Sequence, residues 1–158
     1  MPTISPSLWF DTEAEDAATF YCSVFPNSKI NAITYYTEAS PDRTGQVLTV
    51  DFELDGQEFN AINGGPQFQF TEAVSLVIKC KDQAEVDAYW STLTEGGEEG
   101  PCGWLKDKYG LSWQIVPTPW IELLTSPDRA AVNRGMEAMM GMKKLDLAAL
   151  QAAFAGKA

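Results

Sequence analysis

The feature that most constrains the fold is a pair of short segments that alternate between apolar and polar residues around Asp55-Gly56. Val47 to Leu54 leads into this dipeptide and Gln57 to Asn63 leads out of it. Asp-Gly between alternating segments is the strongest short-range signal for a β-hairpin. A two-residue turn pairs Leu54 with Gln57, so the hairpin register is predicted along its whole length.

That register separates the hairpin side chains into an apolar face and a polar face. On one face Val50 is opposite Ala61 and Phe52 is opposite Phe59, and this face requires a helix over it. The polar face consists of the pairs Asp51 with Asn60, Thr49 with Ile62, and Glu53 with Glu58. It either meets water or borders a cleft.

The hairpin belongs to an order of elements that occurs twice. The first copy has strands at 7–10 and 29–36 on either side of a helix that begins near Thr12 and ends at Pro26. The second copy has a strand at 73–80, a helix ended by Gly96-Gly97, and a hairpin turning at Tyr109-Gly110. The segment between its helix and its hairpin is shorter, so we expect one strand there to be reduced or missing.

Helix ends are marked by capping residues. Two residue pairs predict capped starts of the two helices. They are Thr12 with Glu15 and Asp82 with Glu85. After the second copy, Ser126 is a candidate cap for a helix over 128–140, and residues 145–154 form another amphipathic segment.

Composition excludes several classes of function. The 158 residues contain 22 acidic and 11 basic residues, a formal charge of −11, and no histidine. This charge disfavours nucleic acid and anionic membrane surfaces as partners. Three cysteines (Cys22, Cys80 and Cys102) without CxxC spacing favour reduced thiols over disulfides or zinc. The start of the chain lacks the pattern of a signal peptide, so we expect a cytoplasmic protein.

Four segments carry a resemblance to a known family: LWFDTEAEDAATFYCSVFPNSKI, FNAINGGPQFQFTEAVS, GGEEGPCGWLKDKYGLSWQIVP and MEAMMGMKKLDLAALQAAFAG. With the repeated strand-helix-hairpin order, they resemble the glyoxalase, bleomycin-resistance and extradiol-dioxygenase (vicinal oxygen chelate) superfamily. The closest branch is the PhnB-like proteins, often labelled 3-demethylubiquinone-9 3-methyltransferase domains. The resemblance covers most of the chain.

The resemblance implies an α+β fold of two tandem βαβββ modules forming a cupped mixed sheet, in one domain spanning 1–158. The modules would occupy about 1–66 and 67–120, with C-terminal helices at about 121–158. It also implies a homodimer with a small-molecule pocket inside the cup. The methyltransferase label has no support in the sequence, because no Gly-rich nucleotide-binding turn follows the first strand.

Metal-dependent members of the superfamily place ligands on the first and last strands of each module. Carried onto this chain, the last-strand positions are Asn60 and Gln114, and the first-strand positions are Pro6 or Ser7 and Ser75. Hydroxyls and amides bind transition metals poorly, so we expect neither a catalytic metal nor another cofactor. The alternative is an oxygen-bound ion, such as Mg²⁺, held through Asp51, Asn60 and Gln114.

Without histidine, Ser-His-Asp and Cys-His nucleophiles are excluded, and Asp51 is the best candidate for a general acid or base. Its alternative role is a solvent-facing strand carboxylate. Asn60 and Gln114, at equivalent places in the two copies, either offer amide groups together to a small polar ligand or hydrogen-bond to each other or to neighbouring strands. Trp9 and Trp104 are candidate pocket walls, whereas Phe59 and Trp113 are expected under the helices. Cys102 is expected at the exposed start of a strand and to be inert.

Three functions agree with these residues. The first is a metal-independent small-molecule-binding protein in the manner of the resistance proteins. The second is an enzyme, a lyase, isomerase or transferase, acting on a small polar or aromatic substrate through Asp51 or an oxygen-bound metal. The third is a structural dimerisation module.

Overall fold

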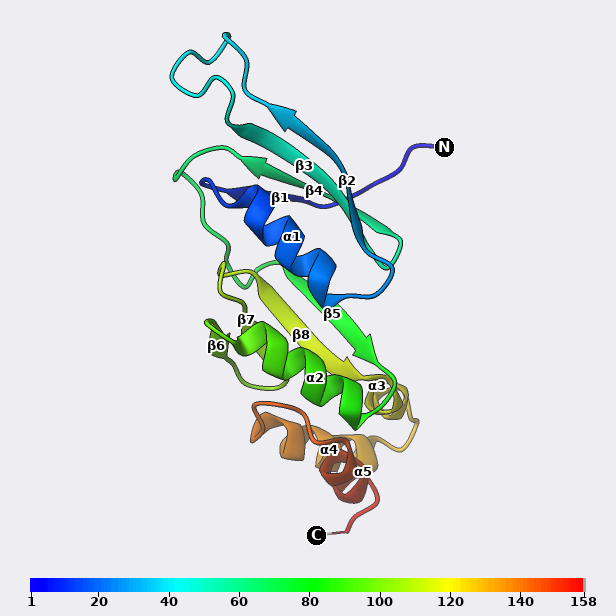
Figure 1. Ribbon diagram of the computed structural model, residues 1–158. Coiled ribbons are helices and arrows are strands. Elements are labelled where there is room, and N and C mark those ends of the chain that lie inside the picture. Colours follow the sequence, from blue (N-terminus) through cyan, green and yellow to red (C-terminus); the bar gives the residue numbers. More distant parts are fainter. Residues whose placement is uncertain (158) are drawn as a thin grey trace. The chain divides into compact units, whose positions relative to one another are not determined.

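The computed structural model describes residues 1–157, which form two compact units, Met1–Gln69 and Phe70 onward. Each unit has the element order βαβββ, and helices follow the second (Figure 1). The first unit contains β1 (Ser7–Phe10), α1 (Ala14–Val24), β2 (Lys29–Tyr35), β3 (Val47–Leu54) and β4 (Gln57–Asn63). The second contains β5 (Ser75–Cys80), α2 (Gln83–Thr94), β6 (Glu98–Glu99), β7 (Trp104–Lys106), β8 (Ser112–Pro117), α3 (Thr118–Leu124), α4 (Arg129–Met140) and α5 (Leu147–Phe154).

Each unit has its own four-stranded mixed sheet. The strand orders are β1-β4-β3-β2 and β5-β8-β7-β6, and in each sheet the first strand pairs in parallel with the last strand of the hairpin. The α+β class and the βαβββ order are therefore as predicted. The reduced strand predicted for the second copy is β6, which has two residues.

The predicted register of the first hairpin is confirmed. Leu54 pairs with Gln57, Phe52 with Phe59, and Asp51 with Asn60. Phe52 and Phe59 stack with ring centroids 5.3 Å apart, and Tyr21 of α1 stacks on Phe52 at 6.4 Å. The apolar face therefore lies under α1, and the face opposite α1 carries the polar residues.

The start of α1 differs from its predicted capping box. The helix begins at Ala14, and no side chain from its own N-terminal turn caps it. Instead the side chain of Asn63, at the end of β4, accepts a hydrogen bond from the Ala14 amide at 2.8 Å. The Thr12–Glu15 prediction was wrong because a side chain distant in sequence satisfies this orphan amide.

The cap of α2 is confirmed, since Asp82 accepts a hydrogen bond from the Glu85 amide at 3.0 Å. The Glu85 carboxylate accepts from the Lys81 amide. At α4 the cap is Asp128, not Ser126, because the Ala131 amide donates to Asp128. Ser126 instead accepts from the Asp128 amide.

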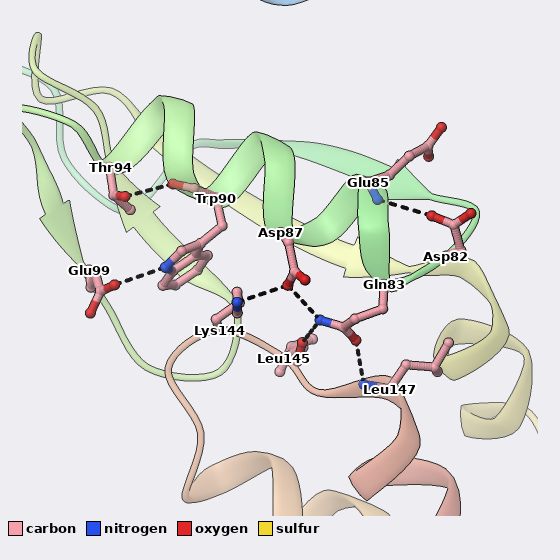
Figure 2. Close-up of polar contacts among 10 residues, drawn as sticks. All are labelled: Asp82, Gln83, Glu85, Asp87, Trp90, Thr94, Glu99, Lys144, Leu145 and Leu147. Carbon is pink, nitrogen blue, oxygen red and sulfur yellow. Dashed lines mark hydrogen bonds and ion pairs between the residues drawn. The ribbon is translucent and has the colours of Figure 1, made fainter.

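The C-terminal helices pack around a small core of Trp120, Leu145 and Leu150. Polar contacts join the segment before α5 to α2 (Figure 2). Gln83 donates to the Leu145 carbonyl at 2.9 Å and accepts from the Leu147 amide at 2.8 Å. Lys144 forms an ion pair with Asp87 at 2.8 Å. The α3 helix lies at the start of the predicted C-terminal helical region but was not predicted as a separate helix.

Within residues 1–157, every helix is too short or too polar to cross a membrane.

Candidate functional site

In the first unit, three predicted site residues form a chain of hydrogen bonds on the face opposite α1. Ser7 of β1 donates to the Asn60 side-chain oxygen at 2.9 Å, and the Asn60 amide donates to Asp51 at 2.7 Å. They are adjacent because β1 and β3 flank β4, with Ser7 and Asp51 both in register with Asn60. Asp51 and Asn60 border a pocket of about 340 Å³ that also includes Glu58 and Asn31.

In the second unit, Trp104, Gln114 and Ser75 lie together on the face opposite α2. Trp104 of β7 is the cross-strand partner of Gln114 in β8. The Gln114 amide donates to the Ser75 hydroxyl at 2.9 Å. Leu105 and Trp113 point to the opposite face and are buried, as alternation along a strand requires.

Register relates the two units and shows where they differ. With Asn60 and Gln114 taken as equivalents, Trp104 occupies in the second unit the place of Asp51 in the first. The register partner of Gln114 on β5 is Val77, so Gln114 reaches Ser75 diagonally. The first unit therefore presents a carboxylate where the second presents an indole, and the two faces suit different ligand groups.

The second unit contains a pocket of about 470 Å³ at the β6–β7 edge of its sheet. Trp104, Lys106 and Ser112 border it from the strands. The other lining residues are Leu105 of β7, Glu72 before β5, Glu98 and Glu99 of β6, and Gly100, Pro101 and Cys102 between β6 and β7. Sequence reasoning included Trp104 but missed Ser112. Strand alternation could have found Ser112, because it lies two residues before Gln114 and so on the same face.

Ser112 is 1% exposed, and its hydroxyl has no hydrogen-bond partner within residues 1–157. Lys106, its cross-strand partner, forms an ion pair with Glu72. The pKa of Lys106 is raised, first by this hydrogen bond with Glu72, and the pKa of Glu72 is lowered, chiefly by the hydrogen bond from Lys106. The pocket thus contains a paired cation and an unpaired hydroxyl.

The cysteines differ in their surroundings. Cys102 is half-buried at the pocket edge and has a positive φ of 57°, a conformation held by its amide bonding to the Met142 carbonyl. It therefore lies in a loop and not at the predicted strand start. Burial raises the pKa of the Cys22 thiol, and burial together with nearby carboxylates raises that of Cys80 to about 12.

Trp9 has a local packing role. Its indole N–H donates to the Gly65 carbonyl at 2.9 Å, and its ring meets Phe68 at 5.0 Å between centroids. A Cβ on Gly64 would lie 2.2 Å from the indole ring, so glycine is required there for space. Gly64 thus leaves room for the Trp9 ring, and Gly65 accepts the hydrogen bond from its indole N–H.

Another pocket in the first unit, of about 370 Å³, lies at the start of α1. Three of its polar residues, Tyr36, Arg43 and Asn63, form hydrogen bonds within the unit. Tyr36 donates to the Asn63 carbonyl at 2.5 Å and accepts from Arg43 at 3.1 Å, while the Asn63 side chain binds Ala14 and Val47. These contacts join the sheet edge to the helix and give the residues a structural role.

The residues at the superfamily's metal-ligand positions do not fit a transition metal. Ser7 and Asn60 hydrogen-bond to each other, as do Ser75 and Gln114, and all four are neutral oxygen or nitrogen groups. Residues 1–157 contain no group of three or more His, Cys, Asp or Glu that could hold a metal ion. Hydroxyls and amides alone are weak ligands for such ions.

Comparison with known proteins gives a consistent family match. The family model described as 3-demethylubiquinone-9 3-methyltransferase matches residues 2–116, which end before the C-terminal helices. A solved PhnB protein of Bacillus cereus, described as a 3-demethylubiquinone-9 3-methyltransferase, is 36% identical with a TM-score of 0.65. The match covers 73% of this chain and 99% of that one. No curated protein matches.

More distant solved structures share the fold. A protein of Pseudomonas aeruginosa is 16% identical over 74% of this chain and 98% of its own, with a TM-score of 0.61. The fosfomycin resistance protein FosX of Listeria monocytogenes, solved with Mn(II) and sulfate, is 16% identical with a TM-score of 0.50. That match covers 72% of this chain and 89% of FosX.

Proposed function

The chain belongs to the 3-demethylubiquinone-9 3-methyltransferase family, the PhnB-like branch of the glyoxalase and bleomycin-resistance superfamily, and we propose that it binds a small molecule without a catalytic metal. The observation that carries this proposal is the group Trp104, Gln114 and Ser75 beside the 470 Å³ pocket of the second unit. An aromatic wall with a few polar groups is typical of small-molecule pockets. The Ser7–Asn60 pair offers comparable polar groups in the first unit.

Methyl transfer is not part of the proposal. A Rossmann-type methyltransferase would bind its cofactor at a glycine-rich turn after the first strand. Here the residues between β1 and α1 are Asp11, Thr12 and Glu13, and α1 continues with Glu15 and Asp16. This acidic, glycine-free turn offers neither close backbone approach nor a favourable charge for an anionic group.

A second candidate function is an enzyme that uses Asp51 as its acid or base. The favouring observation is the 340 Å³ pocket, in which Asp51 accepts a hydrogen bond from Asn60 at 2.7 Å. A reaction that needs this carboxylate would be lost in Asp51→Asn, whereas binding alone would persist. The same substitution therefore separates the two functions.

The remaining family expectations are proposals as well. The protein is a homodimer of the cytoplasm, as the family resemblance, the thiol content and the acidic charge suggest. Its ligand is a small molecule, and nucleic acid and membranes are not its partners.

A thermal-shift screen of small aromatic compounds tests the binding function, because a ligand of the native state raises the melting temperature. We expect Gln114→Leu to abolish the shift of a compound bound in the second unit, and Asn60→Leu to abolish that of one bound in the first. Gln151→Leu, on the exposed side of α5, is the matched control. A shift that survives both variants would contradict the proposed site, and stoichiometric metal kept through dialysis would contradict the metal-free function.

A further inference from the structure

The Ser112 hydroxyl is the starting point, because buried polar groups are almost always hydrogen-bonded and the exceptions concentrate at functional sites. Ser112 is 1% exposed, its hydroxyl has no partner within the described residues, and it borders the 470 Å³ pocket. A ligand group that reaches this oxygen would satisfy it. The hydroxyl can donate one hydrogen bond or accept from a donor such as an ammonium.

The charges around the pocket restrict the ligand. Three carboxylates, Glu72, Glu98 and Glu99, border it together with one ammonium, that of Lys106. Lys106 is paired with Glu72, and one Glu99 oxygen accepts from the Trp90 indole N–H at 2.9 Å (Figure 2). Glu98 is exposed on β6 opposite Lys106, and its charge contributes to the raised pKa of that lysine. The pocket is therefore net negative, and the chain around it carries −11, so an anionic ligand would be repelled.

Trp104 adds an aromatic surface on the same side. Trp104, Leu105 and Lys106 all border the pocket from β7. The side chains of Trp104 and Lys106 lie on the sheet face opposite that of Leu105, which is 2% exposed. An indole ring attracts organic cations through the negative charge density of its face. A hydroxyl acceptor, surplus carboxylates and an indole together favour a positively charged organic ligand.

We infer that the pocket bordered by Trp104, Ser112 and Glu98 receives a small organic cation, an amine on an aromatic or alkyl body. The ammonium pairs with Glu98 and donates to the Ser112 hydroxyl, while the apolar body packs against Trp104. This inference rests on the proposed function, since it names the ligand class for the pocket of the second unit.

Three probes of matched shape and different charge test the class: 2-phenylethylamine, 2-phenylethanol and 3-phenylpropionate. Each is titrated into the full chain at pH 7 and followed by calorimetry and by NMR of the tryptophan indole N–H signals. We expect the amine to bind at least about tenfold more tightly than the alcohol, and the acid not to saturate, because like charges in a site are costly. Added salt should weaken the amine alone.

Matched variants locate the site. Glu98→Gln removes a pocket carboxylate, whereas Glu95→Gln makes the same charge change at the exposed end of α2. Ser112→Ala removes the pocket hydroxyl, whereas Ser91→Ala removes an exposed one on α2. We expect the first variant of each pair to bind the amine several-fold more weakly, and the second variant to bind it as tightly as the wild type. Melting curves confirm that every variant folds.

Cys102 provides an independent readout, because its thiol borders the pocket. The raised pKa values of Cys22 and Cys80 slow their alkylation. We therefore expect iodoacetamide to label Cys102 first, and saturating 2-phenylethylamine to slow this labelling.

Three outcomes would overturn the inference: no saturable binding of the amine, equal or tighter binding of 3-phenylpropionate, or equal losses in Glu95→Gln and Glu98→Gln. If the alcohol or the acid binds as tightly as the amine or more tightly, and Gln114→Leu abolishes this binding, the proposed function stays intact and the cation is excluded. Absence of any ligand in the wider screen would instead remove the proposed function itself.

Discussion

At the scale of single residues, two side chains with opposite hydrogen-bonding states are the most informative. Ser112 has a buried hydroxyl with no hydrogen-bond partner among residues 1–157, whereas Asn63, 8% exposed, uses both ends of its amide. A buried polar group without a partner lowers stability, and a satisfied one secures the elements it joins. Asn63 therefore supports the fold, and Ser112 is the residue from which the ligand inference starts.

Ser112→Ala should raise the free energy of unfolding by about 1 kcal/mol, because it removes the desolvation penalty of an unpaired hydroxyl. Ser75 is the register partner of Ser112 on β5. Ser75→Ala should lower the free energy of unfolding, since the Ser75 hydroxyl accepts a hydrogen bond from Gln114. Urea denaturation of both variants measures the difference. A loss of stability in Ser112→Ala would mean that its hydroxyl is hydrogen-bonded in solution.

Asn63→Ala should lower the free energy of unfolding by about 2 kcal/mol, because α1 loses its cap and the Val47 carbonyl loses a donor. Asn63→Asp keeps the oxygen that accepts from the Ala14 amide, so its free energy of unfolding should fall by less. Asn60→Ala, whose hydrogen bonds are more exposed, is the control. Equal losses at the two asparagines would contradict the capping role.

At the scale of elements, the second unit depends on how α2, α4 and the segment before α5 meet. Gln83 bridges the carbonyl of Leu145 and the amide of Leu147, and Lys144 pairs with Asp87 (Figure 2). In the small C-terminal core, Gly135 of α4 lies against the buried ring of Trp120. These contacts join residues far apart in sequence.

Gly135→Ala tests the contact between α4 and Trp120. Alanine normally stabilises a helix interior by about 1 kcal/mol relative to glycine. Here its Cβ would lie 2.6 Å from two ring atoms of Trp120, so we expect a net loss of about 1–3 kcal/mol. At Gly141 the nearest atom is 3.7 Å away, and Gly141→Ala should be neutral. Thermal unfolding of the two variants checks the contrast.

The Lys144–Asp87 pair predicts part of the acid sensitivity. The hydrogen bond from Lys144, then that from Gln83, lowers the pKa of Asp87 below its ordinary value of 3.8. A lowered folded-state pKa stabilises the fold above 3.8, and this contribution is lost as the pH falls through and below that value. We therefore expect the stability difference between wild type and Asp87→Asn to shrink from pH 6 to pH 3. Lys144→Met should reduce the same dependence, and parallel pH curves would contradict the coupling.

At the scale of the whole molecule, the two units repeat one topology and differ in chemistry. The exchange of Asp51 for Trp104 at equivalent positions makes one sheet face polar and the other aromatic. Because equivalent positions in the two repeats carry different side chains, one fold presents two kinds of surface. This difference also explains why the activity of a family member does not follow from topology alone.

The homodimer is a prediction at this scale. Static light scattering at micromolar concentration should give twice the chain mass of 17.3 kDa. Exposed apolar side chains such as Phe68 and Val77 favour association, because burying them removes apolar surface from water. A mass of 17.3 kDa at every concentration would contradict it.

The sequence by itself determined the local features: the Asp55-Gly56 turn, the pairing of Asp51 with Asn60, the Asp82 cap and the reduced strand β6. Turn chemistry and period-two alternation act between near neighbours, so one chain segment suffices to specify them. It also indicated the family and most of the candidate residues.

Only the tertiary structure decided which distant groups satisfy one another. Asn63 caps α1 in place of Thr12, Gln83 bonds to the C-terminal segment, and the Ser112 hydroxyl finds no partner in the described part of the chain. A hydrogen bond contributes only about 1 kcal/mol net to stability. The choice of partner therefore depends on which groups the packed fold brings within hydrogen-bond distance, about 3 Å. No local pattern in the sequence records that choice.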